Sequence, residues 1–222
     1  MPNTQLPILY TFRRCPYAMR ARMAIYYSGI KVEIREILLK DKPKQMLEVS
    51  SKGTVPVLLK SNGEVVAESR EVIMWALKQY DPDNWYAGLC QDQQGEIQFL
   101  INRNDNDFKP WLDRYKYSVG YPEHSQEHYR KNAEVYLFDL NSRLSRSKYL
   151  IGDAMSVADI AIFPFIRQFA FVDKAWFDQA PYTYLGDWLN KLLKSELFSA
   201  IMDKYDCWHQ GDVITVFPID TG

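Results

Sequence analysis

The chain has 222 residues and a formal net charge of −1, and 47% of its residues are hydrophobic and 25% are charged. This length suits one large domain or two small ones, and the composition is ordinary for a soluble globular protein. The near-zero charge gives no argument for a nucleic-acid or anionic-membrane partner, and neither is expected. No apolar run approaches the roughly 18 residues of a membrane helix. Three scattered cysteines make no disulfide framework, and the first residues lack the pattern of a signal peptide, so we expect a reduced, cytoplasmic protein.

The first eighty residues alternate strand and helix signals. Strands are expected at 8–10, 31–38, 55–59 and 64–67, and helices or helical turns at 16–28, 43–50 and from 68 onward. Asn62-Gly63 is a hairpin signal between the last two strands. This order permits a parallel pair of strands joined through a helix and closed by an antiparallel hairpin, which gives a mixed four-stranded sheet.

Cys15 lies at the expected start of the first helix. Pro16 follows it, and proline is favoured at a first helical position because its missing N–H would be unpaired there. A helix N-terminus favours an anion, and four arginines add positive charge nearby: Arg13, Arg14, Arg20 and Arg22. Both effects lower a thiol pKa from about 8.5 toward roughly 3.5–7.5. A free cysteine is more often a small buried hydrophobe, but this context predicts a reactive thiolate.

Pro56 stands at the start of the third expected strand, where it cannot donate to a central ladder. An ordinary trans proline at a strand start is the simple interpretation. Facing Cys15 across a small sheet, however, the proline suggests a cis peptide bond, which occurs in only about 5% of X–Pro bonds in folded proteins. Such a bond would shape the backbone opposite the thiol.

Three short motifs together resemble a known family. Cys15-Pro16-Tyr17-Ala18, Thr54-Val55-Pro56 and Glu68-Ser69, in that order and spacing, are similar to the thioredoxin-like domain of a glutathione transferase. The resemblance is closest to the cysteine-type members, namely the omega class, the dehydroascorbate reductases and the two-domain glutaredoxins of bacteria. It implies that Cys15 is the catalytic thiol and lies opposite a cis-Pro56.

The resemblance also implies a set of glutathione contacts. Glu68 and Ser69 match the pair that holds the γ-glutamyl end, which suits a carboxylate facing an ammonium and a hydroxyl at a helix N-terminus. Val55 matches the residue whose backbone pairs with the cysteinyl moiety. Lys42 matches an omega-class lysine that reaches the glycyl carboxylate, and Tyr17 lies beside the thiol. Taken alone, Lys42 is a solvated surface lysine and Glu68-Ser69 is a helix start.

One position departs from the dithiol glutaredoxins. Those proteins need a second cysteine three positions after the first, and Ala18 stands there. A mixed disulfide at Cys15 would therefore be resolved by an external thiol, most simply a second glutathione. Exchange with Cys90 or Cys207 would require folding to bring one of them close. We expect a monothiol cycle.

The second half of the chain is predicted to be helical. Polar residues with Pro82 and Gly88 mark a linker over 81–93, which separates a thioredoxin-like domain over 1–80 from an all-helical domain over 94–222. Helical spacing covers 96–117, 125–146 and 182–205. The strand-like run 213–217 has no evident place, and covering the domain junction is one interpretation.

Ser156 begins the clearest motif of the second half. Asp159 follows it at the spacing of a capping box, and Met155 and Ile160 stand where a hydrophobic staple would. The helix that follows is nearly all apolar, which predicts burial, and Pro164 within it predicts a kink. Glutathione transferases begin their core helix with the same cap, so the resemblance spans both domains. We expect this cap to stabilise the start of the helix and assign no chemistry to Ser156 or Asp159.

A pocket for the second substrate is expected between the domains, over Cys15. Aromatic residues are candidates to line it, although core packing is the simpler interpretation for each one: Tyr115, Tyr121, Phe169, Trp176 and Trp208. The three histidines show no metal-ligand spacing with the cysteines, so no metal is expected.

The sequence thus predicts a glutathione-dependent thiol transferase or oxidoreductase, such as a dehydroascorbate reductase, with glutathione as co-substrate. A conjugating transferase is the first alternative, with Tyr10 or Thr11 as weak candidates to activate glutathione. A binding or regulatory protein without turnover is the second, and the Glu68-Ser69 pair argues mildly against it. The resemblance further implies a homodimer.

Overall fold

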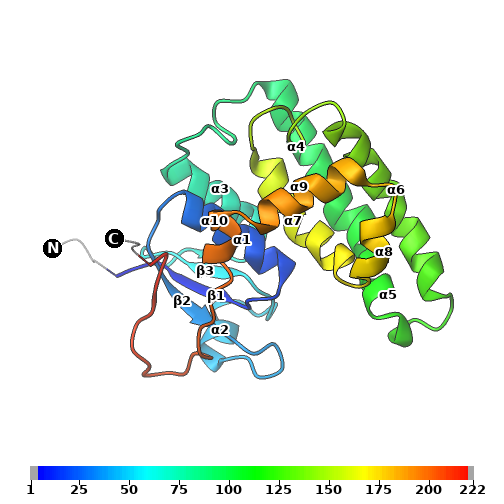
Figure 1. Ribbon diagram of the computed structural model, residues 1–222. Helices are drawn as coiled ribbons and strands as arrows, with labels where there is room; N and C mark the ends of the chain where they lie inside the picture. The colour runs from blue at the N-terminus through cyan, green and yellow to red at the C-terminus, as the bar shows by residue number, and fades with distance from the viewer. Residues whose placement is uncertain (1–4, 220–222) are drawn as a thin grey trace. The chain divides into compact units, whose positions relative to one another are not determined.

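The computed structural model describes residues 5–219 (Figure 1). The chain divides into two compact units. One unit contains the chain as far as Asp83 together with the segment from Ser195 onward, and the other runs from Asn84 to Lys194. The expected division had assigned all of 94–222 to the helical domain. Residues 1–4 and 220–222, which belong to the expected end ranges, lie outside the described residues.

The first unit contains a mixed sheet in the strand order β4-β3-β1-β2-β5 (Figure 1). Its strands are β1 (Ile8–Thr11), β2 (Val32–Glu36), β3 (Val57–Leu59), β4 (Val65–Val66) and β5 (Val216–Phe217). Strands β1 and β2 are parallel, and the other neighbours in the sheet are antiparallel. Its helices are α1 (Pro16–Tyr27), α2 (Lys44–Val49), α3 (Ser69–Gln79) and α10 (Glu196–Ala200). The predicted strand–helix order is therefore confirmed.

Helix α1 is the crossover between β1 and β2. It starts at Pro16, as the sequence predicts, and its cap residue Ser28 is followed by Gly29 at φ +62°, a left-handed conformation that glycine adopts without a steric penalty. The helix packs against both α3 and α10, and its residues from Ala18 to Ile25 are all buried. Two of these buried residues are arginines, Arg20 and Arg22.

The C-terminal tail corrects two predictions. The expected sheet had four strands, and the tail adds β5 as a fifth, antiparallel to β2 with Val32 opposite Phe217. The helical prediction over 182–205 was too long, because α9 ends at Leu193, Ser195 caps the short α10, and no helix follows Ala200 among the described residues. An edge strand offers unpaired backbone groups to any nearby extended segment, and a two-residue strand has too little pattern to reveal its partner.

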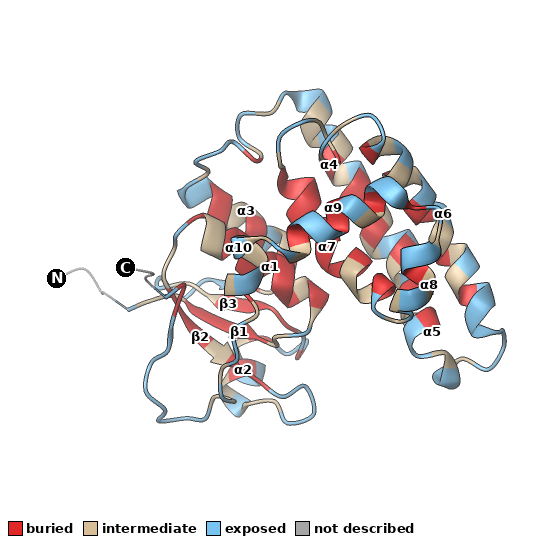
Figure 2. Cartoon of the chain, viewed as in Figure 1, coloured by how far each residue is buried: buried red, intermediate tan, exposed pale blue. Residues whose placement is uncertain are grey.

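The second unit is helical. Its segments are α4 (Gln91–Arg103), a π-helical turn (Asn104–Phe108), α5 (Lys109–Lys116), a 3₁₀ turn (Ser118–Gly120), α6 (Gln126–Leu144), α7 (Val157–Ala170), α8 (Lys174–Gln179) and α9 (Thr183–Leu193). Figure 2 shows α7 buried along most of its length, as its apolar sequence predicts. Pro164 lies inside α7 without ending it. No helix within residues 5–219 combines the length and apolar character needed to cross a bilayer.

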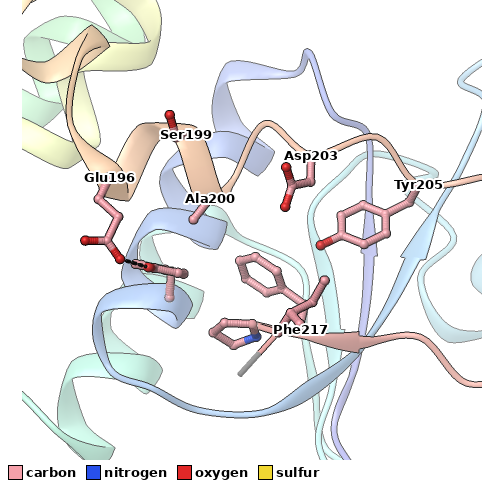
Figure 3. Close-up of a pocket in the computed structure, with 9 residues that line it drawn as sticks. Glu196, Ser199, Ala200, Asp203, Tyr205 and Phe217 are labelled. Carbon is pink, nitrogen blue, oxygen red and sulfur yellow. Dashed lines mark hydrogen bonds between the residues drawn. The ribbon is translucent and has the colours of Figure 1, made fainter. Parts of the chain in front are cut away.

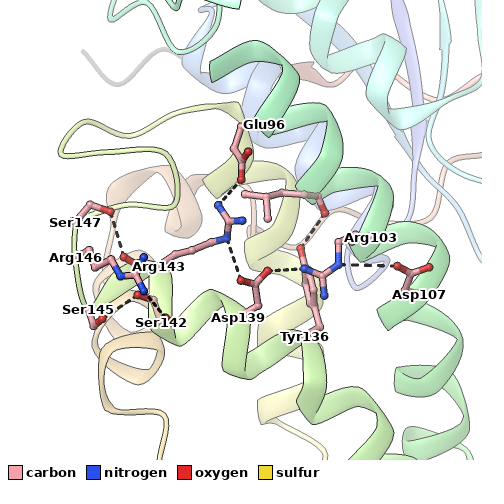
Figure 4. A network of polar contacts seen from close by, with 11 residues as sticks. Glu96, Arg103, Asp107, Tyr136, Asp139, Ser142, Arg143, Ser145, Arg146 and Ser147 are labelled. Atoms are coloured by element: carbon pink, nitrogen blue, oxygen red, sulfur yellow. Dashed lines mark hydrogen bonds and ion pairs between the residues drawn. The ribbon is translucent and has the colours of Figure 1, made fainter. Parts of the chain in front are cut away.

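Two polar clusters stabilise the helical unit. At the start of α7 the predicted capping box forms, and the buried Asp159 also accepts from the backbone of Leu150 at 3.1 Å and the indole of Trp188 at 2.9 Å. Across α4 and α6, Arg103 pairs with Asp139, and Arg143 pairs with both Asp139 and Glu96 (Figure 4). The first cluster fixes the start of the core helix, and the second ties together two helices that are partly exposed.

Candidate active site

Cys15 occupies the N-cap position of α1 and is half-buried. Its thiol lies 3.7 Å from the carbonyl oxygen of Val55, to which it donates a weak hydrogen bond. The bond between Val55 and Pro56 is cis, as the sequence predicts. Cys15 therefore lies at the start of a helix and beside the backbone that precedes a cis-proline, packed against one edge of a core cluster that includes Tyr10, Ala18 and Val55.

The loop between β1 and Cys15 is held by hydrogen bonds from Arg22. The guanidinium group is buried and donates to the Thr11 hydroxyl, to the carbonyl of Phe12 at 3.4 Å and to the carbonyl of Arg13 at 2.7 Å. The loop is also held by Glu36, whose carboxylate accepts from the backbone N–H of Arg13 at 2.6 Å. The route of the chain into Cys15 is thus specified by a buried arginine and a buried glutamate.

Burial and charge act in opposite directions at this pair. Burial lowers the pKa of the Arg22 guanidinium to about 10, while the negative charges of Glu36 and Cys15 raise it. Burial raises the pKa of the Glu36 carboxyl, and the Arg13 backbone N–H and the Arg22 charge oppose that shift. A pKa of about 10 keeps Arg22 protonated at neutral pH. Since the charge of Cys15 acts on this guanidinium, the Arg22 cation lies close enough to interact with a thiolate at Cys15.

Ser69 and Glu68 lie at the start of α3. Ser69 is buried, and its hydroxyl accepts from the guanidinium of Arg20 at 3.0 Å. Glu68 is the exposed N-cap residue and forms an ion pair with Lys52. Arg20 also lies over the ring of Tyr17, 5.0 Å from its centroid. Tyr17, Arg20 and Ser69 therefore form one connected group, in which the α1 arginine joins the start of α3 to the turn after Cys15.

Lys42 is half-buried, and its side chain runs past the backbone of Gly53. A Cβ atom at Gly53 would lie 3.4 Å from the Lys42 ammonium nitrogen and 3.3 Å from the side chain of Leu47. Gly53 also has φ +59°, a conformation that other residues rarely adopt. The lysine side chain thus lies against the turn that leads into Val55, the residue before the cis-proline.

Comparison with known proteins identifies the family. A family model described as the glutathione S-transferase N-terminal domain matches residues 9–84, and a model described as the C-terminal domain matches residues 123–191. The chain belongs to the glutathione transferase superfamily. The N-terminal model lies in the first unit except for its last residue, and the C-terminal model lies in the second unit. The cis-proline and the α7 cap lie where the superfamily resemblance predicted them.

Three relatives illustrate the range of that superfamily. Glutathione S-transferase omega-1 of Sus scrofa is 26% identical over 212 residues, which cover 88% of this chain and 76% of that protein. Elongation factor 1-gamma of Drosophila melanogaster is 24% identical over 160 residues, covering 70% of this chain and 36% of that protein. The crystal structure of glutathione transferase URE2P6 from Phanerochaete chrysosporium with oxidized glutathione is 21% identical, covers 90% of this chain and 96% of that chain, and has a TM-score of 0.77, which shows the shared fold.

The aromatic residues suggested for a second-substrate pocket belong to different units of this transferase fold. Tyr115 and Phe169 lie in the core of the helical unit, 2% and 1% exposed, with ring centroids 5.0 Å apart. Trp176 packs on Phe169 and beneath Arg130, and Tyr121 is half-buried beside Tyr129. For Tyr115 and Phe169 the core-packing interpretation accounts for the burial.

Trp208 lies in the first unit. Its ring contacts the edge of Tyr10 at a centroid distance of 6.0 Å, and Arg35 lies over it at 4.1 Å. It packs against the same core cluster as Cys15. Trp208 also borders a cavity of about 240 Å³ whose other lining residues include Pro43 and Cys207. The tail therefore brings an aromatic side chain to the sheet, which the sequence pattern alone could not place.

The hydroxyls proposed for a conjugating enzyme are both enclosed. Tyr10 is 1% exposed, its hydroxyl accepts from Arg35 at 2.7 Å, and burial raises its pKa. Thr11 is 0% exposed and accepts from Arg22. Sequence reasoning missed the roles of Arg22 and Glu36. For Arg22 a signal was present, because the residue was counted as a nearby charge. Its burial could not be predicted, because burial depends on contacts from distant parts of the chain.

Proposed function

We propose that this transferase is a glutathione-dependent thiol transferase in which Cys15 is the nucleophile. The observation that supports this most directly is the position of Cys15 at the N-cap of α1, beside Val55 and the cis-Pro56. A helix N-terminus and the buried Arg22 cation favour a thiolate, whereas the hydrogen bond to the Val55 carbonyl favours the protonated thiol. The reactive cysteine is proposed to be used as a monothiol, because residue 18 is alanine.

The proposed cycle has two displacements. The Cys15 thiolate attacks the glutathionyl sulfur of a mixed disulfide, which forms a Cys15–glutathione disulfide and releases the other thiol as a thiolate that takes up a proton. The thiolate of a second glutathione then attacks the glutathionyl sulfur on Cys15, which forms glutathione disulfide and restores the Cys15 thiolate. One mixed disulfide and one glutathione thus give one free thiol and one glutathione disulfide. With dehydroascorbate as oxidant, two glutathiones would be oxidised per substrate reduced.

The same geometry supports a proposed set of glutathione contacts. Glu68 is exposed at the start of α3 and suits the ammonium of the γ-glutamyl group, and Ser69 suits its carboxylate. Val55 supplies the backbone next to the thiol, with Pro56 holding that backbone in its cis form. Lys42 suits the glycyl carboxylate. Tyr17, which lies beside Arg20, completes the proposed site.

Two alternatives remain open to test. A conjugating transferase would need a hydroxyl or another group to activate glutathione, and the burial of Tyr10 and Thr11 gives it little support. A binding protein without turnover is the second alternative, because the relatives of this chain include a protein that is named for another role, elongation factor 1-gamma. We retain the thiol transferase because Cys15 lies at the N-cap of α1 beside a cis-proline.

The first experiment is the pH dependence of Cys15 alkylation, followed by peptide mass analysis so that Cys90 and Cys207 are counted separately. We expect a midpoint well below the value of about 8.5 for a free thiol, and one added glutathione at Cys15 after treatment with glutathione disulfide. The Cys15→Ser variant should lose the adduct. A midpoint near 8.5 with no adduct would overturn the thiol mechanism, and glutathione affinity would then separate conjugation from a binding role.

We further propose, from the superfamily, that the protein is a cytoplasmic homodimer. Sedimentation velocity at micromolar concentration tests the oligomeric state, and a monomer at the highest concentration reached would contradict it.

A further inference from the structure

The C-terminal segment, defined here as Ile201 to Pro218, is hydrogen-bonded to the rest of the first unit at several points. The Trp208 N–H donates to the carbonyl of Glu36 at 2.8 Å. Further along, the Ile34 N–H donates to the carbonyl of Thr215 at 2.9 Å, and β5 pairs with β2. The Lys31 ammonium donates to the carbonyl of Pro218 at 2.7 Å. The segment therefore follows β2 from one end to the other.

The same segment also packs beside α1 and α10. Figure 3 shows Tyr205 and Phe217 facing a cavity that is also lined by residues of α10. This cavity has a volume of about 240 Å³, and at its edge the Tyr26 hydroxyl donates to Glu196 at 2.7 Å. The C-terminal segment and α1 thus share a common surface.

Arg22 connects this segment to the loop that precedes Cys15. Besides its acceptors at Thr11, the last residue of β1, and at Phe12 and Arg13 in the loop, its Nε donates to the carbonyl of Ile201 at 3.2 Å. The residue is 1% exposed. A guanidinium group offers five N–H donors in a fixed fork, so moving any one of these acceptors requires the others to move or to lose their bond.

A second connection runs through Glu36. Its carboxylate accepts from the Arg13 N–H and its carbonyl accepts from the Trp208 N–H, while the side chain of Arg13 donates to the carbonyl of Met202 at 3.4 Å. Glu36 is 7% exposed. The loop is therefore bounded by two buried charged residues, and each of them also holds backbone of the C-terminal segment.

The charges that face Arg22 are Glu36 at the end of β2, Cys15 at the start of α1, Tyr205 in the C-terminal segment and Arg13 in the loop. The first three favour the protonated guanidinium and Arg13 opposes it. Cys15 is thus one of the groups whose charge interacts with Arg22. Because a coupling free energy between two sites is reciprocal, the Arg22 charge favours a thiolate at Cys15 as much as the thiolate favours the protonated Arg22.

We propose that Arg22 is a positioning residue for Cys15, and that the C-terminal segment acts through Arg22 and Glu36 to hold the loop that delivers the thiol to its glutathione site. This inference rests on the proposed function. It assigns two effects to Arg22: its charge favours the thiolate, and its fork of donors keeps Cys15 aligned with Val55, Glu68 and Ser69. A purely structural arginine would change stability without changing either.

Two reagents separate alignment from ionisation. Iodoacetamide and glutathione disulfide both react with the thiolate, but only the disulfide needs the glutathione site. We define the alignment ratio as the rate constant for the glutathione adduct at Cys15 divided by that for its alkylation at the same pH. Changes in thiolate fraction cancel in this ratio, while the pH midpoint of alkylation reports ionisation by itself.

Arg22→Lys keeps the charge and removes the fork, and it should lower the alignment ratio by about tenfold or more while leaving the midpoint in place. Arg22→Met removes both, and it should also raise the midpoint by about one pH unit. Arg103→Met is the matched control, because Arg103 pairs with Asp139 and Asp107 in the helical unit (Figure 4). It should lower the resistance to urea and leave ratio and midpoint unchanged.

An unchanged ratio in Arg22→Lys, in a protein whose wild-type thiol reacts as proposed, would overturn the positioning role and leave the proposed function intact. A wild-type midpoint near 8.5 without an adduct would overturn both. The two failures are therefore distinguishable, because the first appears only in the variants and the second in the unmodified protein.

The contribution of the C-terminal segment is tested at Trp208. Trp208→Ala removes the ring and keeps the N–H, and Trp208→Pro removes both. If the alignment ratio is lower in the proline variant than in the alanine variant by about threefold or more, the hydrogen bond from the Trp208 N–H to Glu36 contributes to positioning Cys15. Equal alignment ratios in the two variants would contradict a contribution of the C-terminal segment to the position of Cys15.

Hydrogen exchange on Arg22→Lys gives an independent measurement if the proline variant does not fold. The amides of residues 11–15 and of the segment 201–218 should lose protection together, because one guanidinium holds both. Loss of protection in only one of the two would contradict a shared attachment.

Discussion

Asp159 in the helical unit and Arg22 in the first unit are both buried charged residues, and they differ in where their partners come from. In the helical unit, Asp159 accepts from Leu150, Ser156 and Trp188, and the first two lie within nine positions of it. In the first unit, Arg22 donates to a loop that precedes it and to Ile201, close to the other end of the chain. The first arrangement is mainly local, and the second joins distant segments.

The difference has a functional meaning. Asp159 fixes the start of a core helix to which we assign no chemistry, so its effect is on stability. Arg22 fixes the loop that leads into Cys15, so its effect should extend to reactivity. Burying a charged side chain costs free energy unless the side chain is hydrogen-bonded or paired. The partners of Asp159 and of Arg22 therefore show which segments the fold must keep together.

Loss of the Phe217 side chain should have the largest effect on stability. Phe217 is 1% exposed in the two-residue strand β5 and packs beside Tyr26. Phe217→Ala should lower the free energy of unfolding by about 3–5 kcal/mol, measured by urea denaturation. Ile219→Ala, at a position that is 61% exposed, is the control and should change it little. Equal effects of the two substitutions would show that the tail contributes little to the first unit.

Loss of the Asp159 carboxylate should come next. Asp159→Ala leaves buried N–H donors of Leu150, Ser156 and Trp188 without their acceptor, which should cost about 3 kcal/mol in urea unfolding. Asp153→Ala is the control, because this carboxylate is exposed and lies three residues before the N-cap Ser156. The pH midpoint of Cys15 alkylation should stay unchanged in both. A shifted midpoint in Asp159→Ala would contradict the separation between the two buried charges.

The smallest expected effect is a change in pH dependence at Glu36. Burial raises the pKa of this carboxyl, so the folded protein holds its proton more tightly than the unfolded chain. Stability therefore falls as pH rises through the window between the unfolded value of about 4.3 and the higher folded value. Glu36→Gln should remove this slope, so that in urea unfolding the stability of the variant rises relative to that of the wild type as pH rises through that window.

Glu64→Gln gives the contrast for that measurement. The Lys60 ammonium lowers the pKa of the exposed Glu64, so its contribution is present above the unfolded pKa and is lost as pH falls through the lower, folded pKa. Its substitution should change the slope in the opposite direction and by less, because solvent screens an exposed pair. The same direction of change in both variants would contradict the assignment of Glu36.

Much of the fold was predictable because its signals are short-range. The strand–helix order of the first eighty residues, the start of α1 at Pro16 and the capping box of α7 all follow from neighbouring residues. The cis bond before Pro56 was expected from the proline and its place opposite Cys15. The roles assigned to Tyr17, Lys42, Val55, Glu68 and Ser69 stay predictions that the alkylation and adduct measurements begin to test.

The sequence by itself determined a cysteine followed by proline at a helix start, a thioredoxin-like order of elements and a helical second half, because periodicity and caps are encoded within a few residues. Only the tertiary structure decided that the tail returns to β2, that Trp208 packs on Tyr10, and that Arg22 is buried between the Cys15 loop and Ile201. A two-residue strand has almost no pattern of its own. The partners of a buried arginine depend on how the distant ends of the chain meet, which no local signal contains.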